Sequence, residues 1–314
     1  MKNFKLRLGL FLAGIIVIVG VSTAVANNTT SEPSAKSESD FYHTFFKYAS
    51  ATNNIEPVGE SPPVTQGLIN YGQWTYRGLC IGCHGIEADG NGAVWELADK
   101  WGNGHKLPRK PRDFTSAVFK VRSTPSGSLP TDRDLFMAIS RGLVADEDMP
   151  AFKFLPERDR WAVIAYLKTL SPVWVEEAED QEDPIEVGEP PMPSEEIVRA
   201  GKDVYLEMKC AKCHGEHGHG DGPSAPQLED DNGLSIEPRD FSDASMFVAG
   251  SDPRGVYQTF TTGFDGTPMP SFADFLDEDQ RWQLVWYVMS LRDGWDLEKA
   301  REEFPGSQEQ DSSG

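Results

Sequence analysis

Cysteine is scarce in this chain of 314 residues, with four in all, which excludes a small scaffold held together by disulfides. Positive charge is also in short supply, because 29 lysines and arginines stand against 50 aspartates and glutamates, a formal charge of −21. Binding to nucleic acid requires a basic surface, so this balance argues against a nucleic-acid-binding protein. The composition shows no bias towards collagen or wholesale disorder, and the length suggests about two globular domains.

Residues 1–26 are typical of an export segment. Three basic residues precede a largely apolar run over residues 8–25, and Ala24-Val25-Ala26 has the A-x-A form of a signal-peptide cleavage site. The same run is about 18 residues long, the lower limit for crossing a hydrocarbon core, so an uncleaved membrane anchor is the alternative. Both interpretations place the rest of the chain in the periplasm or elsewhere outside the cytoplasm.

The exported part is more acidic than the whole chain. Without residues 1–26 it has 26 basic and 50 acidic residues, a formal charge of −24. Such a surface attracts basic partners over long distances, so we expect redox partners with basic docking surfaces; solubility alone is the alternative explanation. Residues 27–65 begin with a polar stretch that predicts a flexible tether, followed by a short aromatic segment.

The central feature of the sequence is an internal repeat. Each copy carries, in the same order, Gly-x-x-x-Tyr, Cys-x-x-Cys-His, Pro-Arg-Asp-Phe, Met-Pro-x-Phe and an amphipathic helix with Trp and Tyr. The first copy has these features at 72–76, 80–84, 111–114, 149–152 and 161–170, and the second at 201–205, 210–214, 238–241, 269–272 and 282–291. Five ordered correspondences indicate a duplication.

The repeat predicts the domain organisation. We expect two domains, over residues 66–174 and 197–295, joined by a linker over 175–196 and followed by a polar tail over 296–314. The linker is acidic and rich in proline, so it is expected to be a solvated and fairly stiff spacer.

Cys-x-x-Cys-His is the attachment signature of c-type haem. Two thiols at i and i+3 project from one helical turn and can form thioethers to the two vinyl groups of one porphyrin, while the adjacent histidine binds iron. We therefore expect two covalently attached haem c groups, one at Cys80 and Cys83 with His84 on iron, the other at Cys210 and Cys213 with His214 on iron. A thioredoxin-like site would need a βαβ pattern, which is absent here. A zinc site would need both cysteine pairs in one small module, whereas these pairs lie in separate repeats.

Each repeat offers one methionine as the second axial ligand of iron. Met149 and Met269 both precede proline, which favours an extended loop, and they follow the first cysteine of their repeat by 69 and 59 residues. Histidine–methionine ligation raises the reduction potential, as in electron-carrying cytochromes. The alternatives are core methionines and, at the first haem, ligation by His105. His217 and His219 are too close to the proximal histidine to reach the opposite face of the ring easily.

The Pro-Arg-Asp-Phe motifs suggest a further contact with the haem groups. Arg112 and Arg239 are candidates to hydrogen-bond haem propionates, because guanidinium suits carboxylate recognition. A local ion pair with Asp113 or Asp240 is the alternative.

These motifs together resemble the class I cytochrome c family in a tandem dihaem form, over roughly residues 66–293. The resemblance implies a mostly α fold of two small helical domains, each around one haem, with little strand. It also implies that the first and last helices of each domain cross. In the first domain Gly72 and Tyr76 would meet Trp161 and Tyr166, and in the second Gly201 and Tyr205 would meet Trp282 and Tyr287.

In that family a Gly-Pro loop often supports the proximal histidine through a carbonyl hydrogen bond. The second repeat offers Gly222-Pro223, whereas the first has Gly92-Ala93, so the same support is not evident for the first haem. The Pro-Arg-Asp-Phe insertion is similar to that of c-type subunits attached to respiratory oxidoreductases, which makes a membrane respiratory complex a candidate partner.

The function that follows is single-electron transfer by a non-enzymatic respiratory cytochrome, as a carrier or as a subunit of an oxidoreductase complex. The alternative is a dihaem peroxidase, which needs an open coordination position at iron. A methionine candidate for each haem argues against that alternative.

Overall fold

The computed structural model describes residues 57, 61–101, 110–143, 149–247 and 249–306. The first domain contains α3 (Gln66–Leu79), α4 (Ile81–His84), α5 (Ala93–Trp101), α6 (Asp132–Arg141), α7 (Glu157–Leu167) and α8 (Val173–Glu176). The second contains α9 (Glu195–Glu207), α10 (Ala211–His214), η1 (Ala225–Gln227), η2 (Ala244–Met246), α11 (Pro253–Thr262), α12 (Glu278–Ser290) and α13 (Leu297–Glu303). The described residues form no strand, only two isolated bridges, so the expected mostly α fold is confirmed.

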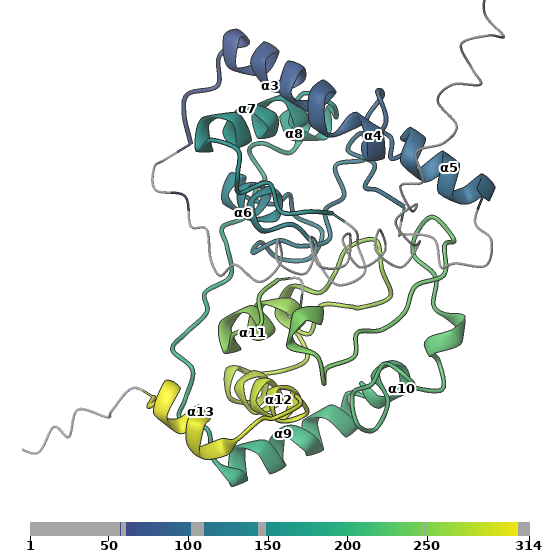
Figure 1. Ribbon diagram of the computed structural model, residues 1–314. Helices are drawn as coiled ribbons and strands as arrows, with labels where there is room; N and C mark the ends of the chain where they lie inside the picture. The colour runs from purple at the N-terminus through teal and green to yellow at the C-terminus, as the bar shows by residue number, and fades with distance from the viewer. Residues whose placement is uncertain (1–56, 58–60, 102–109, 144–148, 248, 307–314) are drawn as a thin grey trace, which may run out of the picture. The chain divides into compact units, whose positions relative to one another are not determined.

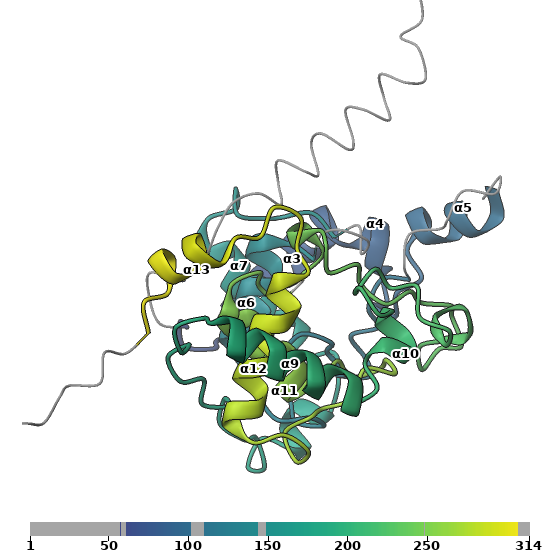
Figure 2. The ribbon, with the colours of Figure 1, turned by 90° about the horizontal axis from the view of Figure 1, so that it is seen from below.

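The first and last helices of each domain pack against each other, as Figure 1 shows for α3 with α7 and Figure 2 for α9 with α12, and each pair meets at a glycine. A Cβ on Gly72 would lie 1.8 Å from the carbonyl oxygen of Ala162, and one on Gly201 would lie 1.9 Å from that of Gln283. Only glycine allows the backbones to approach this closely. The crossing that the resemblance to class I cytochromes c implied is therefore present in both domains.

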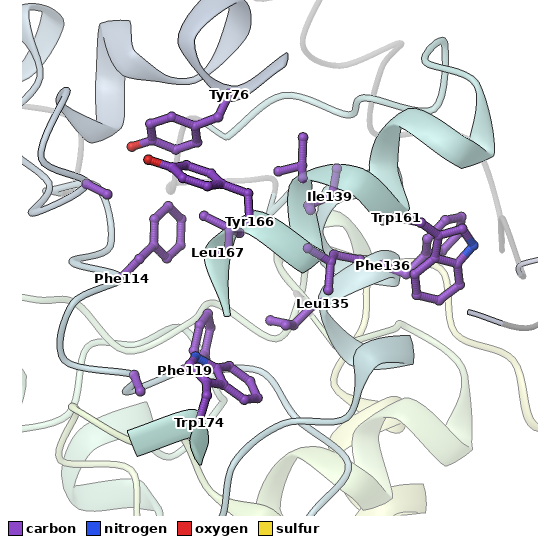
Figure 3. Close-up of a cluster of buried hydrophobic side chains, with 14 of the residues drawn as sticks. Tyr76, Phe114, Phe119, Leu135, Phe136, Ile139, Trp161, Tyr166, Leu167 and Trp174 are labelled. Atoms are coloured by element: carbon purple, nitrogen blue, oxygen red, sulfur yellow. The ribbon is translucent and has the colours of Figure 1, made fainter. Parts of the chain in front are cut away.

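Tyrosines fill the space beside each crossing. The rings of Tyr76 and Tyr166 lie 5.4 Å apart between centroids (Figure 3), and those of Tyr205 and Tyr287 lie 5.2 Å apart. The predicted tyrosine contacts are thus correct. Buried aromatic pairs at this distance each contribute about 1 kcal/mol beyond the area that they bury.

The tryptophans of the last helices have aromatic partners on a middle helix of each domain. Trp161 lies 4.3 Å from Phe136 of α6 (Figure 3), and Trp282 lies 4.5 Å from Tyr257 of α11. These contacts were not predicted, because the sequence interpretation did not include α6 and α11. Each of these helices has a recognisable start, a Thr131–Asp134 capping box in α6 and Asp252 before a proline in α11.

The linker is bound along its length. Residues 177–194 form no helix, and most of their acidic side chains are exposed, as predicted. Its backbone is nevertheless hydrogen-bonded, since Ile185 N donates to Ser123 O at 2.8 Å and the Trp286 indole donates to Pro191 O at 3.0 Å. The linker is therefore a bound strap rather than a free spacer.

The segment interpreted as a polar tail begins with a helix. Asp296 caps α13 by accepting from Lys299 N, and Phe304 packs 5.7 Å from the indole of Trp286. Arg301 donates to Pro193 O at 3.0 Å, which ties α13 to the end of the linker. A single aromatic residue among charged ones was too weak a signal to predict this contact.

A buried ion pair links the two repeats. The side chain of Arg122, fully buried, pairs with Asp265 at 2.9 Å and donates to Thr262 O at 3.0 Å. Gln258 donates in turn to the carbonyl of Arg122. A buried guanidinium needs such partners, because leaving it unpaired costs several kcal/mol.

Substituting alanine at Gly72 should destabilise the protein. The new Cβ would meet the backbone of Ala162, so the helices must separate, at a cost of about 1–3 kcal/mol as in other overpacked cores. Alanine at Gly78, in the same helix with nothing within 4 Å of its Cβ, should instead stabilise by about 1 kcal/mol. Urea unfolding of the haem-loaded protein measures both; equal effects at the two positions would contradict the close crossing.

Candidate haem sites

The Cys-x-x-Cys-His motif forms a single helical turn in each domain. In the first, Cys80 ends α3 and begins α4, and its carbonyl accepts from Cys83 N at 3.2 Å and His84 N at 2.9 Å. Cys210 makes the same two hydrogen bonds, at 3.2 and 2.9 Å, with Cys213 N and His214 N. The local geometry that haem attachment requires is therefore built twice.

A backbone carbonyl orients each histidine. His84 Nδ1 lies 3.1 Å from Arg112 O, and His214 Nδ1 lies 3.4 Å from Arg239 O. Since a carbonyl only accepts, Nδ1 carries the proton, and the lone pair of Nε2 is left for a metal.

This hydrogen bond corrects the expectation of a Gly-Pro support. Both repeats take the carbonyl from Pro-Arg-Asp-Phe, so the first site has the same support as the second. Gly92 and Gly222 instead allow their loop to approach the haem-attachment turn closely. A Cβ on Gly92 would lie 2.4 Å from the backbone of Cys83, and one on Gly222 would lie 2.4 Å from that of Lys212. The sequence interpretation gave a role to the arginine side chain of this motif and missed the role of the arginine carbonyl.

The phenylalanine of the same motif packs on the histidine. The rings of His84 and Phe114 are stacked with centroids 4.5 Å apart, and those of His214 and Phe241 are 4.4 Å apart. Sequence reasoning also missed this contact, although recurrence of the phenylalanine in both repeats was a usable signal. The carbonyl and the ring together hold each imidazole in one orientation.

Burial keeps both histidines neutral. Desolvation lowers the pKa of His84 below its ordinary value and that of His214 to about 4, against an opposing effect of the carbonyl hydrogen bond. Neutral imidazole is the form that binds iron. Desolvation likewise raises the pKa of Cys80 to about 12 and that of Cys210 to about 11. All four cysteines lie outside any disulfide. Two thiols and one directed, neutral imidazole per domain fit haem c.

The tyrosines also stabilise the attachment turn. Tyr76 donates its hydroxyl to Gly85 O at 2.8 Å, and Tyr205 donates to Gly215 O at 2.6 Å. Both glycines have φ of +80°, in the left-handed region that favours glycine. The helix crossing is thereby connected directly to the residue that follows each histidine.

The two methionine loops are held alike. Met149 O accepts from Leu143 N at 3.1 Å, and Met269 O accepts from Phe264 N at 3.0 Å, just after α6 and α11 end. Each methionine is partly buried at the margin of its own domain core, as is the first cysteine of that domain. This arrangement places both sulfur-bearing loops in equivalent positions.

The remaining residues that the sequence suggested as ligands or ion-pair partners make other contacts or fall outside the described residues. His105 and residues 1–56 fall outside the described residues. His217 and His219 are exposed on the loop after α10, and His219 pairs with Asp240 at 3.2 Å. The Asp113 and Asp240 carboxylates accept hydrogen bonds from their own loops, at Thr115 and Ser242.

No helix in the described part of the chain is both long and apolar enough to cross a bilayer.

Comparisons with known proteins agree with this geometry. A family model described as "Cytochrome c" matches residues 198–292, and one described as "Cytochrome C oxidase, cbb3-type, subunit III" matches residues 68–167. A chain of the reducing HAO-like protein complex of Kuenenia stuttgartiensis is 42% identical, with a TM-score of 0.67, over 75% of this chain and 100% of that one.

A curated relative matches a shorter part of the chain. The cbb3-type cytochrome c oxidase subunit FixP of Sinorhizobium medicae (strain WSM419) is 33% identical over 102 residues. The match covers 30% of this chain and 30% of FixP.

Replacing Phe241 with leucine should alter the second site alone. Loss of the stacked ring frees the imidazole of His214, so the electron paramagnetic resonance (EPR) signal of one haem should shift or broaden while haem content is kept. Stability should fall by on the order of 1 kcal/mol. Leucine at Phe275, which is 69% exposed, is the control and should change neither. Identical spectra for both variants would contradict the orienting role of Phe241.

Proposed function

Since the chain belongs to the cytochrome c family, with two haem-binding domains in tandem, we propose that it transfers single electrons between redox partners outside the cytoplasm. The observation that carries this function is the duplicated site, in which a neutral, carbonyl-oriented histidine follows two thiols. Bound haem supplies reversible one-electron chemistry, whereas the protein supplies ligands, burial and orientation.

The ligand sets are part of the proposal. Cys80 and Cys83 hold the first haem and Cys210 and Cys213 the second, with His84 and Met149, and His214 and Met269, as the axial pairs. The equivalent anchoring of both methionine loops supports this assignment. With two protein ligands, neither iron has a position for substrate, which favours electron transfer over peroxidase-type catalysis.

Arg112 and Arg239 have two roles in this proposal. Their carbonyls orient the histidines, and their guanidinium groups bind haem propionates. Arg112 Nη1 lies near Gly266, 3.4 Å from the position of a Cβ there, beside the loop that leads to Met269. Binding of a haem carboxylate by either arginine would strengthen cofactor binding without changing the ligands of iron.

We also propose partners and location. FixP is described as an oxidase subunit and the Kuenenia chain belongs to a protein complex, so a redox complex is the natural setting for this chain. An exported charge of −24 suits partners with basic docking surfaces. Residues 1–26 would serve as signal peptide or, through residues 8–25, as membrane anchor.

Alanine at Met149 or at Met269 tests the proposal. Each substitution should abolish the methionine–iron charge-transfer band of its own haem and lower the reduction potential of that haem, because a sulfur ligand that favours the reduced state is lost. An optical redox titration of the exported, haem-loaded protein measures both effects.

The control is Met192→Ala, since this methionine is 50% exposed and lies in the linker, and it should leave both haems unchanged. An unchanged band in the Met149 variant would point to His105 or another ligand. Rapid turnover of peroxide by the unmodified protein would favour an enzyme.

A further inference from the structure

Each proximal histidine begins a row of packed aromatic side chains. In the first domain His84 packs on Phe114, which lies 6.1 Å from Phe119, and Phe119 lies 5.7 Å from Trp174. Figure 3 shows the last two rings in contact. Trp174 is only 6% exposed, so the row ends in a buried, uncharged indole.

The row in the second domain ends in a charge. His214 packs on Phe241, which lies 5.7 Å from Phe247. The guanidinium carbon of Arg292 lies 4.5 Å from the centre of the Phe247 ring. A cation over an aromatic face is itself attractive, which helps to fix Arg292 in this place.

The Arg292 guanidinium is buried and incompletely hydrogen-bonded. Its Nε and Nη2 atoms are shielded from solvent and have no hydrogen-bond partner among the described residues. Burial lowers the pKa of Arg292 to about 10, so it remains a cation at neutral pH. Asp252 exerts an attraction, but its carboxylate caps α11 by accepting from Arg254 N and Gly255 N.

We infer that Arg292 is a tuning residue of the second haem site: it donates to a haem carboxylate and makes this haem more oxidising than it would be without the charge. The inference rests on the proposed function, in which each domain holds one haem. Buried N–H donors need acceptors, and the haem carboxylates are of the chemical class that guanidinium binds best. A cation in a site of low dielectric disfavours the additional positive charge of ferric iron, so it raises the reduction potential.

The first repeat has no charge at the equivalent position, and its buried Arg160 lies over Phe136 and donates to Ser140 instead. Arg292 follows Leu291 as Ser171 follows Leu170, so serine stands at the same position in the first repeat. Lys168 does lie 5.0 Å over the Trp174 ring, but it pairs with Asp132 at 2.7 Å and is about one-third exposed. Its charge is therefore compensated and screened by water.

Three variants of the full haem-loaded protein test this role: Arg292→Gln, Arg292→Ser and Arg292→Lys. EPR-monitored redox titration follows the two low-spin haems separately. Gln and Ser should shift the potential of the second haem to more negative values and leave the first unchanged, whereas Lys, which keeps the charge, should stay near the unmodified protein. Arg281→Gln is the matched control, because that guanidinium lies 5.3 Å over Tyr257 in the same domain, and it should shift neither haem.

Two results would overturn the inference: a Gln variant with both potentials unchanged, or a Lys variant shifted as far as Gln. If the Gln and Ser variants fail to retain haem, the Lys variant decides, since a potential near that of the unmodified protein supports a role of charge and a clear fall refutes it. Absence of a second haem from the unmodified protein would instead refute the proposed function.

Discussion

The hydrogen bond that Nδ1–H of each histidine donates to a backbone carbonyl is the interaction on which each site depends. It sets the tautomer, and thereby leaves Nε2 as the atom available to iron. The carbonyl belongs to Arg112 or Arg239, so Pro-Arg-Asp-Phe is an orienting element whose phenylalanine packs on the same imidazole. Other parts of the domain support this arrangement. The crossing helices fix the attachment turn through a tyrosine hydroxyl, and the backbone just after α6 or α11 fixes the methionine loop.

The repeated motifs predicted two domains and the attachment turns because these features follow from residue types at fixed spacing, whereas the helix crossings were implied by the resemblance to class I cytochromes c. Gly72 and Gly201 identify the crossings, since no other residue fits against a backbone carbonyl. Contacts made by the backbone were not predictable in the same way. The role of the Arg112 carbonyl depends on where a loop passes, and a carbonyl is present at every residue.

The missed helices and the linker have a related cause. Helices α6 and α11 carry capping residues but none of the repeated motifs, so the motifs predicted neither these helices nor their contacts with the tryptophans. The strap over 177–194 is bound through its backbone while its acidic side chains face solvent, so composition alone indicates a spacer. Helix α13 depends on Phe304 meeting Trp286, a contact between residues that the sequence does not connect.

The two repeats share the frame around the histidine and differ at its periphery. Equivalent hydrogen bonds hold both imidazoles, whereas the rows of packed side chains end in Trp174 in one domain and Arg292 in the other. The frame around the histidine is therefore common to both repeats, and the charge at its periphery differs. If both proposals hold, the two haems are similarly ligated but have different potentials, which would give an internal electron step a direction.

The central claim is that both iron atoms have two protein ligands. Low-temperature EPR of the unmodified, fully oxidised protein tests it most directly. The account predicts two low-spin ferric signals of equal intensity and no high-spin signal. A high-spin signal from one haem, including one that added cyanide converts to low spin, would show an open coordination position and contradict this account.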